Sequence, residues 1–227
     1  MLLENPDYLD LPENYLLTYD LYLWIACIII GVISSILFFI RTKKSRIDIQ
    51  KGLLLGLAIF CLLFSLMRVA YILSIHMPGD GSGEVYDFWT LMGYICGLSG
   101  FGGVLFGIER YVVKKTKYSL SIFTFAVVIF GIIALTGNIN RELVMSFVYA
   151  IVLVDAALMA IIYIGLIQKT TGVIRKRTAA ALIGVVALVV STALDSQVGL
   201  AILGNLYVPP LLAIMGILLI TIVQRYQ

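Results

Sequence analysis

The stretch from residue 52 to residue 75 reads GLLLGLAIFCLLFSLMRVAYILSI, and Arg68 is its only charged residue. The hydrocarbon core of a bilayer is about 30 Å thick, and a helix needs about 20 apolar residues to cross it. This stretch therefore predicts a transmembrane helix, which also satisfies its own backbone hydrogen bonds in lipid. Six further stretches predict spans at residues 17–40, 88–109, 119–137, 143–167, 179–199 and 207–224. The predicted fold class is an all-α membrane protein, a seven-transmembrane helix bundle.

The composition agrees with a membrane location. Of the 227 residues, 61% are hydrophobic and 13% are charged, whereas soluble domains average about 45–50% and about 25%. We expect residues 1–16 to form a short acidic extracellular tail, because this segment lacks the basic region that begins a secretory signal. We expect residues 17–227 to form a single seven-helix transmembrane domain. The bilayer is then the main partner, and no nucleic-acid partner is expected.

The positive charges predict how the chain is threaded. Fourteen of the sixteen Lys and Arg residues fall in the segments 41–51, 110–117 and 169–177 and near the C-terminus. Loops rich in Lys and Arg stay on the cytoplasmic side of a membrane. We therefore expect a multi-pass protein of the cell membrane with its N-terminus outside and its C-terminus inside. The basic loops would contact anionic lipid, and they could also dock a protein partner.

Charged residues inside a span are costly and are default candidates for a functional site. Arg68 and Asp195 have opposite charges and similar predicted depths in two spans, so we expect an ion pair inside the bundle. The pair could fix the fold without any ligand, or it could anchor an outward-facing ligand pocket. The predicted ligand-binding residues are Arg68, Asp195, Tyr71, Tyr94, Tyr149 and Gln197.

Asp155 lies near the middle of the span at 143–167, and no Lys, Arg or His shares its depth. A carboxylate in such a place could be a proton or cation site, or a protonated group that hydrogen-bonds a neighbouring helix. The span at 88–109 is rich in glycine, including the four-apart pairs Gly93/Gly97 and Gly103/Gly107. Small residues let helices approach closely, so we expect this helix to be the central, most buried one.

The triplet Glu109-Arg110-Tyr111 ends the span at 88–109 on the predicted cytoplasmic side. This triplet and the seven-helix threading resemble the G-protein-coupled receptors, whose third helix ends in Asp/Glu-Arg-Tyr. The resemblance implies a cytoplasmic switch formed by these three residues. The threading also resembles the microbial rhodopsins, but residues 207–224 contain no Lys for a retinal Schiff base. No cofactor is therefore expected.

The remaining inventory argues against an enzyme without excluding one. A single His, His76, cannot build the usual zinc site, and neither a P-loop nor a Gly-x-Ser-x-Gly elbow is present. We expect a receptor-like or sensory protein that binds a small ligand and signals through its basic loops to a cytoplasmic or membrane protein partner. The alternatives are a small transporter or channel that uses Asp155, and an accessory membrane subunit.

Overall fold

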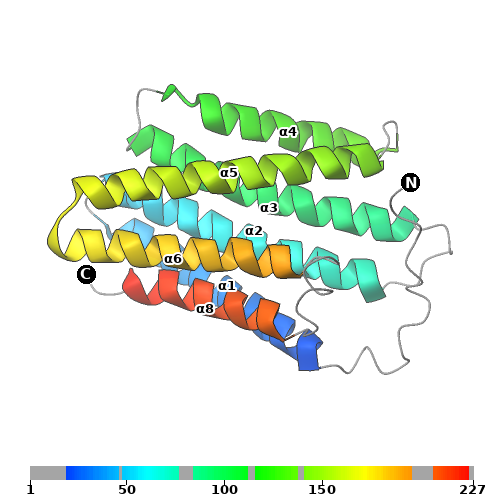
Figure 1. The fold of residues 1–227 in the computed structure, drawn as a ribbon, viewed down its shortest axis with the longest axis horizontal. Coiled ribbons are helices and arrows are strands. Elements are labelled where there is room, and N and C mark those ends of the chain that lie inside the picture. The colour runs from blue at the N-terminus through cyan, green and yellow to red at the C-terminus, as the bar shows by residue number, and fades with distance from the viewer. Residues whose placement is uncertain are drawn as a thin grey trace.

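The computed structural model describes residues 19–45, 48–76, 84–111, 116–137, 141–195 and 207–224. Within these ranges the chain is all-helical and forms seven helices (Figure 1). They are α1 (Tyr19–Lys44), α2 (Asp48–His76), α3 (Glu84–Tyr111), α4 (Ser119–Leu135), α5 (Arg141–Lys169), α6 (Gly172–Leu194) and α8 (Val208–Val223). The all-α class predicted from the sequence is confirmed.

Five of these helices are long and apolar enough to cross a membrane. Their candidate spans are Asp20–Lys44, Gln50–Ile75, Glu84–Arg110, Leu143–Lys169 and Arg175–Leu194. The other two, α4 and α8, are just as apolar but have only 17 and 16 residues. At about 1.5 Å of rise per residue they extend about 24–26 Å, somewhat less than a bilayer core of about 30 Å.

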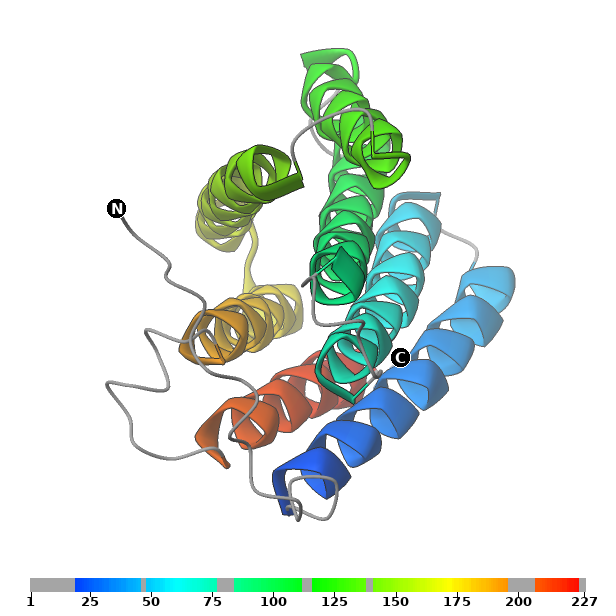
Figure 2. The same ribbon diagram turned by 90° about the vertical axis from the view of Figure 1, so that its right-hand side faces the viewer.

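Successive helices run in opposite directions, so the bundle has two distinct ends (Figure 1). We call the end that holds Lys44, Tyr111 and Lys169 the basic end, because the Lys- and Arg-rich segments lie there. The opposite end, where α1 and α3 begin and α6 terminates, is called the acidic end. Figure 2 views the bundle from the acidic end, with α1, α2, α3, α5, α6 and α8 arranged in a ring and α4 outside it against α3 and α5.

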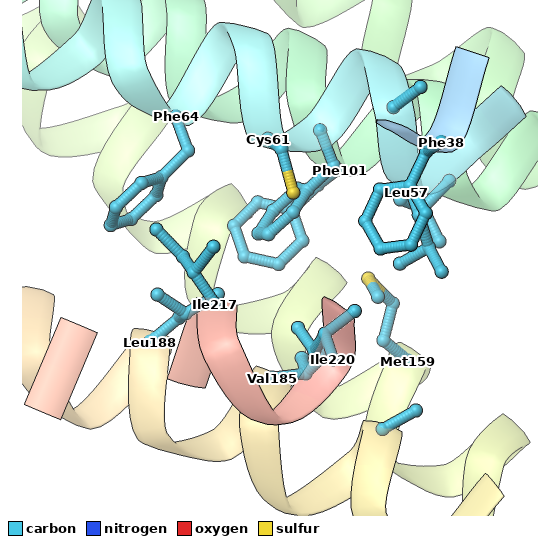
Figure 3. Close-up of a cluster of buried hydrophobic side chains, with 14 of the residues drawn as sticks. Phe38, Leu57, Cys61, Phe64, Phe101, Met159, Val185, Leu188, Ile217 and Ile220 are labelled. Atoms are coloured by element: carbon cyan, nitrogen blue, oxygen red, sulfur yellow. The ribbon is translucent and has the colours of Figure 1, made fainter. Parts of the chain in front are cut away.

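Two groups of buried apolar side chains hold the helices together. The larger one draws on all six helices of the ring, and Figure 3 shows how Phe64 and Phe101 face Leu188 and Ile217 across it. The smaller one joins α4 to α3 and α5 through residues such as Ile95, Val128 and Val148. Among the five candidate spans, α3 is the most buried, followed by α2. The prediction of a central glycine-rich helix is confirmed.

Glycine allows the closest helix contacts. A Cβ added at Gly107 would lie 2.8 Å from the carbonyl oxygen of Gly52, so the backbones of α3 and α2 meet there without a side chain between them. The helices α6 and α8 meet in the same way, because a Cβ at Gly216 would lie 2.7 Å from the carbonyl oxygen of Gly184. These approaches fix the spacing of α2–α3 and α6–α8.

One predicted boundary was wrong in a way that affects the site. The span expected at 179–199 is the helix Gly172–Leu194, which begins earlier and ends earlier. Asp195 is therefore not inside a span but is the C-cap residue of α6. Counting apolar letters extended the span past Asp195, whereas the helix hydrogen bonds end there. The carbonyl-rich C-terminus of a helix disfavours a carboxylate, so Asp195 needs a compensating cation.

Candidate functional site

The predicted ion pair between α2 and α6 is present. Arg68 is almost fully buried, with 2% of its side chain exposed, and its Nη1 donates to Oδ2 of Asp195 at 2.5 Å. Its Nη2 donates to the hydroxyl oxygen of Thr192, one turn earlier on α6, at 3.1 Å. The guanidinium therefore binds α6 at two points and offsets the carboxylate at the C-terminus of that helix.

Aromatic rings cover the guanidinium. The Cζ of Arg68 lies 3.8 Å from the ring centroid of Trp24, 5.2 Å from that of Phe64 and 5.6 Å from that of Tyr71. A cation over the face of an aromatic ring is attracted by its quadrupole, most strongly by tryptophan. The guanidinium is almost fully buried and has little contact with water. The three rings therefore stabilise its charge in addition to the ion pair.

Sequence reasoning did not select Trp24 for this site. A signal was present, because α1 and α2 are antiparallel neighbours joined by a short connection. Trp24 lies 20 residues before the end of α1, and Arg68 lies 20 residues after the start of α2. Equal distance from the connection places both residues at the same height in the helix pair.

Asp20 is a second residue that the sequence did not single out for this site. It lies at the start of α1, close enough to Arg68 and Asp195 to interact electrostatically with both. Its Oδ1 and the Nε of Arg68 are buried and have no hydrogen-bond partner among the described residues. Near the acidic end, one cation and two carboxylates from three helices thus lie close together.

A cavity adjoins this charged group between α2, α3, α5 and α6. Its volume is about 40 Å³, enough for a few water-sized groups. Tyr71, Tyr94 and Tyr149 line it in a row, with ring centroids 5.8 Å and 6.0 Å apart in edge-to-face contacts. Thr192 also lines the cavity while it accepts the hydrogen bond from Arg68. Apolar side chains complete the wall, among them Phe60, Phe64, Met67, Phe101, Val152, Leu153, Leu188 and Val189.

The position of the Tyr71 ring depends on a glycine in α3. A Cβ added at Gly93 would overlap the Tyr71 ring, lying 2.7 Å from its Cδ1. Position 93 must therefore lack a side chain for the ring to lie against α3. In this position Tyr71 contacts both the Arg68 guanidinium and the Tyr94 ring, and so connects the charged group to the cavity.

Most of the predicted ligand-binding residues therefore come together at the acidic end. Arg68 and Asp195 form the pair, and Tyr71, Tyr94 and Tyr149 line the adjoining cavity. Gln197, the sixth predicted residue, lies outside the described residues.

Asp155 lies in a different place, on the side of α5 that faces α4. Its side chain is buried, with 2% exposed, and Oδ2 accepts a hydrogen bond of 2.9 Å from the hydroxyl of Thr124. The same hydroxyl is 3.1 Å from the carbonyl oxygen of Leu120, and one hydroxyl proton serves one acceptor at a time. Asp155 is not part of the cavity wall, and its contact joins α5 to α4.

Glu109 has a structural role that its triplet did not predict. Its carboxylate accepts hydrogen bonds from the backbone N–H groups of Leu120 at 3.1 Å and Ser121 at 2.9 Å, and from the Ser121 hydroxyl. The first N–H groups of a helix have no partner within it, and a carboxylate there also favours the helix dipole. Glu109 therefore caps α4, and a lock between Glu109 and Arg110 would compete with these bonds. Tyr111 ends α3, and its side chain lies outside the described part of the structure.

The site brings together a buried ion pair, a row of tyrosines and a small cavity, and each rests on contacts within this chain. No protein-family model, curated protein or solved structure matches the chain.

Proposed function

We propose that this chain is a seven-transmembrane, receptor-like or sensory protein that binds a small ligand near its acidic end. In this proposal α4 and α8 also cross the membrane, the acidic end faces outside, and the basic end is cytoplasmic. The distribution of Lys and Arg supports this orientation. The exposed apolar side chains along every helix, such as Ile29, Leu66, Ile129, Ile161 and Met215, support contact with lipid.

The observation that carries the proposal is that the wall of the cavity contacts the buried ion pair. Phe64, Tyr71 and Thr192 line the cavity and also contact Arg68. A pocket with apolar walls and a few polar groups, beside a charged pair within the bundle, is the usual form of a small-molecule site. A molecule bound there would press directly on the helix that Arg68 holds at Asp195.

This arrangement gives the ligand a mechanical route to the basic end. The cavity lies partly between α5 and α6, and these two helices meet again at the basic end beside Lys169, Arg175 and Lys176. A ligand that favours one relative position of α5 and α6 shifts the population toward that position. The exposed cations of this connection would then present a changed surface to an acidic patch of a cytoplasmic or membrane partner.

The test is to identify what binds in native membranes. The wild type, an Ala193→Trp variant that fills the cavity and a Val190→Trp control are extracted with their surrounding lipid, without detergent, and analysed by mass spectrometry. Ala193 lines the cavity, whereas Val190 lies on the exposed face of the same helix. We expect a small molecule that accompanies the wild type and the control but is lost from Ala193→Trp. Identical contents in all three preparations would refute the proposed site.

A transporter or channel is the second candidate, supported by the buried carboxylate of Asp155 and its neutral partner Thr124. In proteoliposomes, Asp155→Asn should then abolish a pH-dependent flux that the wild type carries, while Val154→Asn at the exposed neighbouring position should not. An unaltered flux in Asp155→Asn would remove this candidate. An accessory membrane subunit is the third possibility, and a stoichiometric partner protein without any small ligand would favour it.

A further inference from the structure

We propose that the ligand of this cavity is an uncharged, slender and mostly apolar molecule with a single hydrogen-bonding group, and that it enters from the lipid between α5 and α6. The inference rests on the proposed function and specifies the chemistry and the route of access of the same site.

The charge around the cavity argues for a neutral ligand. No charged side chain lines the cavity wall. The neighbouring charged group consists of Arg68, Asp195 and Asp20; Arg68 and Asp195 form a direct ion pair, and none of the three residues lines the cavity. An isolated charge taken out of water costs several kcal/mol unless it finds a partner. Neither a carboxylate nor an ammonium group would find an unengaged partner in this wall.

Four of the wall residues carry a hydroxyl group, Tyr71, Tyr94, Tyr149 and Thr192. The Thr192 hydroxyl is engaged, since it accepts from Arg68 and lies 3.0 Å from the carbonyl oxygen of Leu188. The three tyrosines carry the other hydroxyl groups of the wall residues. A phenol both donates and accepts, so it suits one hydroxyl or carbonyl group on a ligand. The rest of the wall is aliphatic or aromatic and suits a hydrocarbon body.

The exposure of the wall residues points to an opening on the α5 and α6 side of the cavity. Most wall residues on α2 and α3 are buried, whereas most of those on α5 and α6 are partly exposed, with 46% of Leu153 exposed; Leu188 on α6 is buried. These two helices spread apart from the basic end toward the acidic end (Figure 1). Val154 on α5 and Val186 on α6 are exposed and apolar. A ligand dissolved in the hydrocarbon of a bilayer would meet this opening directly, without crossing a polar surface.

The size of the cavity limits the ligand further. About 40 Å³ admits a few water-sized groups. This space holds only the end of a short alkyl chain, so the rest of the chain would extend through the opening, and a bulky ring system would require the helices to separate. The ligand class is therefore that of a short-chain alcohol, ketone or amide.

The experiment uses the full chain in phosphatidylcholine nanodiscs with three photoreactive probes of equal length. The probes are aliphatic diazirine analogues of 1-pentanol, pentanoate and pentylammonium, with unlabelled 1-pentanol as competitor. We expect saturable labelling of cavity residues by the alcohol, and at least about tenfold less by either ion, because one factor of ten needs only about 1.4 kcal/mol. Ala193→Trp should abolish this labelling, and Val190→Trp should leave it unchanged.

The outcomes separate the inference from the proposed function. Saturable cavity labelling in which pentanoate or pentylammonium equals or exceeds the alcohol would overturn the neutral ligand and leave the site itself standing. Labelling by all three probes that is unsaturable and confined to exposed apolar residues would overturn both. For the route, Leu153→Trp at the opening should slow cavity labelling by the alcohol. An unchanged rate in that variant would overturn access between α5 and α6.

Discussion

The contact between Gly93 and Tyr71 gives the sharpest prediction about how the cavity is built. In Gly93→Ala the added Cβ would lie 2.7 Å from Cδ1 of Tyr71 and overlap the ring, whereas ordinary contacts begin near 3.4 Å. The ring must therefore move by at least several tenths of an ångström. Tyr71 is packed between the Arg68 guanidinium and the Tyr94 ring, so a movement of the ring disturbs both contacts. Overpacking of this kind typically costs about 1–3 kcal/mol.

A second effect acts in the opposite direction and provides an internal control. Alanine is favoured over glycine in a helix by about 0.5–1 kcal/mol. Gly165 on α5 has no atom within 4 Å of an added Cβ, so Gly165→Ala should show this gain alone. In Gly93→Ala the gain offsets part of the overpacking. We expect Gly93→Ala to be less stable than Gly165→Ala by about 1–3 kcal/mol.

The assay is a double-mutant cycle with Tyr71→Leu, which removes the ring but keeps an apolar side chain. Unfolding by sodium dodecyl sulfate in mixed micelles is followed by Trp24 fluorescence in a Trp89→Phe background. Gly93→Ala should destabilise the protein when Tyr71 is present and stabilise it slightly when Leu occupies position 71. The coupling energy should reach about 1–3 kcal/mol, as for residues in direct contact. If Gly93→Ala changed the free energy of unfolding equally in both backgrounds, the predicted contact between position 93 and the Tyr71 ring would be refuted.

Three further predictions concern contacts outside the cavity. Glu109→Ala should lower the free energy of unfolding by about 0.5–2 kcal/mol, because α4 loses its cap. Amide hydrogen exchange should become faster in the first turn of α4 only. Unchanged exchange in α4 would contradict the capping role. Thr124→Val should lower the free energy of unfolding by about 1–3 kcal/mol, because it removes the hydroxyl that donates to Asp155. The double variant Thr124→Val with Asp155→Leu should recover most of that stability in the same unfolding assay, and a purely additive loss would contradict this. Ser191→Ala removes a 2.7 Å hydrogen bond to the carbonyl oxygen of Pro209. It should lower the free energy of unfolding by about 0.5–1.5 kcal/mol. A difference below the error of the unfolding assay would contradict the link between α6 and α8.

The sequence was most informative where one residue type was out of place. Arg68 stood out because it is the only charge in a 24-residue apolar stretch, and the structure shows it paired with Asp195 as predicted. Trp24 did not stand out, because an aromatic residue near a helix end has an ordinary explanation at a membrane surface. Only the neighbouring position of α1 and α2 shows that its ring covers the guanidinium.

The contacts of the carboxylates also depend on which helices are neighbours. The sequence predicted Arg68 as the partner of Asp195, but it could not say what Glu109 and Asp155 face. The structure turns Glu109 to the first turn of α4, Asp155 to the hydroxyl of Thr124, and Asp195 to Arg68. A short polar contact depends on the rotation of both helices about their axes. A helix with apolar residues on all sides does not reveal that rotation in its sequence.

The sequence by itself determined which segments of this chain are helical and which few residues conflict with an apolar setting. That information is local, because a long apolar run satisfies its backbone groups only within its own helix when water is absent. The tertiary structure decided which helices are neighbours, how closely glycine lets them approach, and which side chains meet between them. These depend on packing across helices that are distant in the sequence. The cavity beside Thr192 exists only because four helices, α2, α3, α5 and α6, place their side chains around one space.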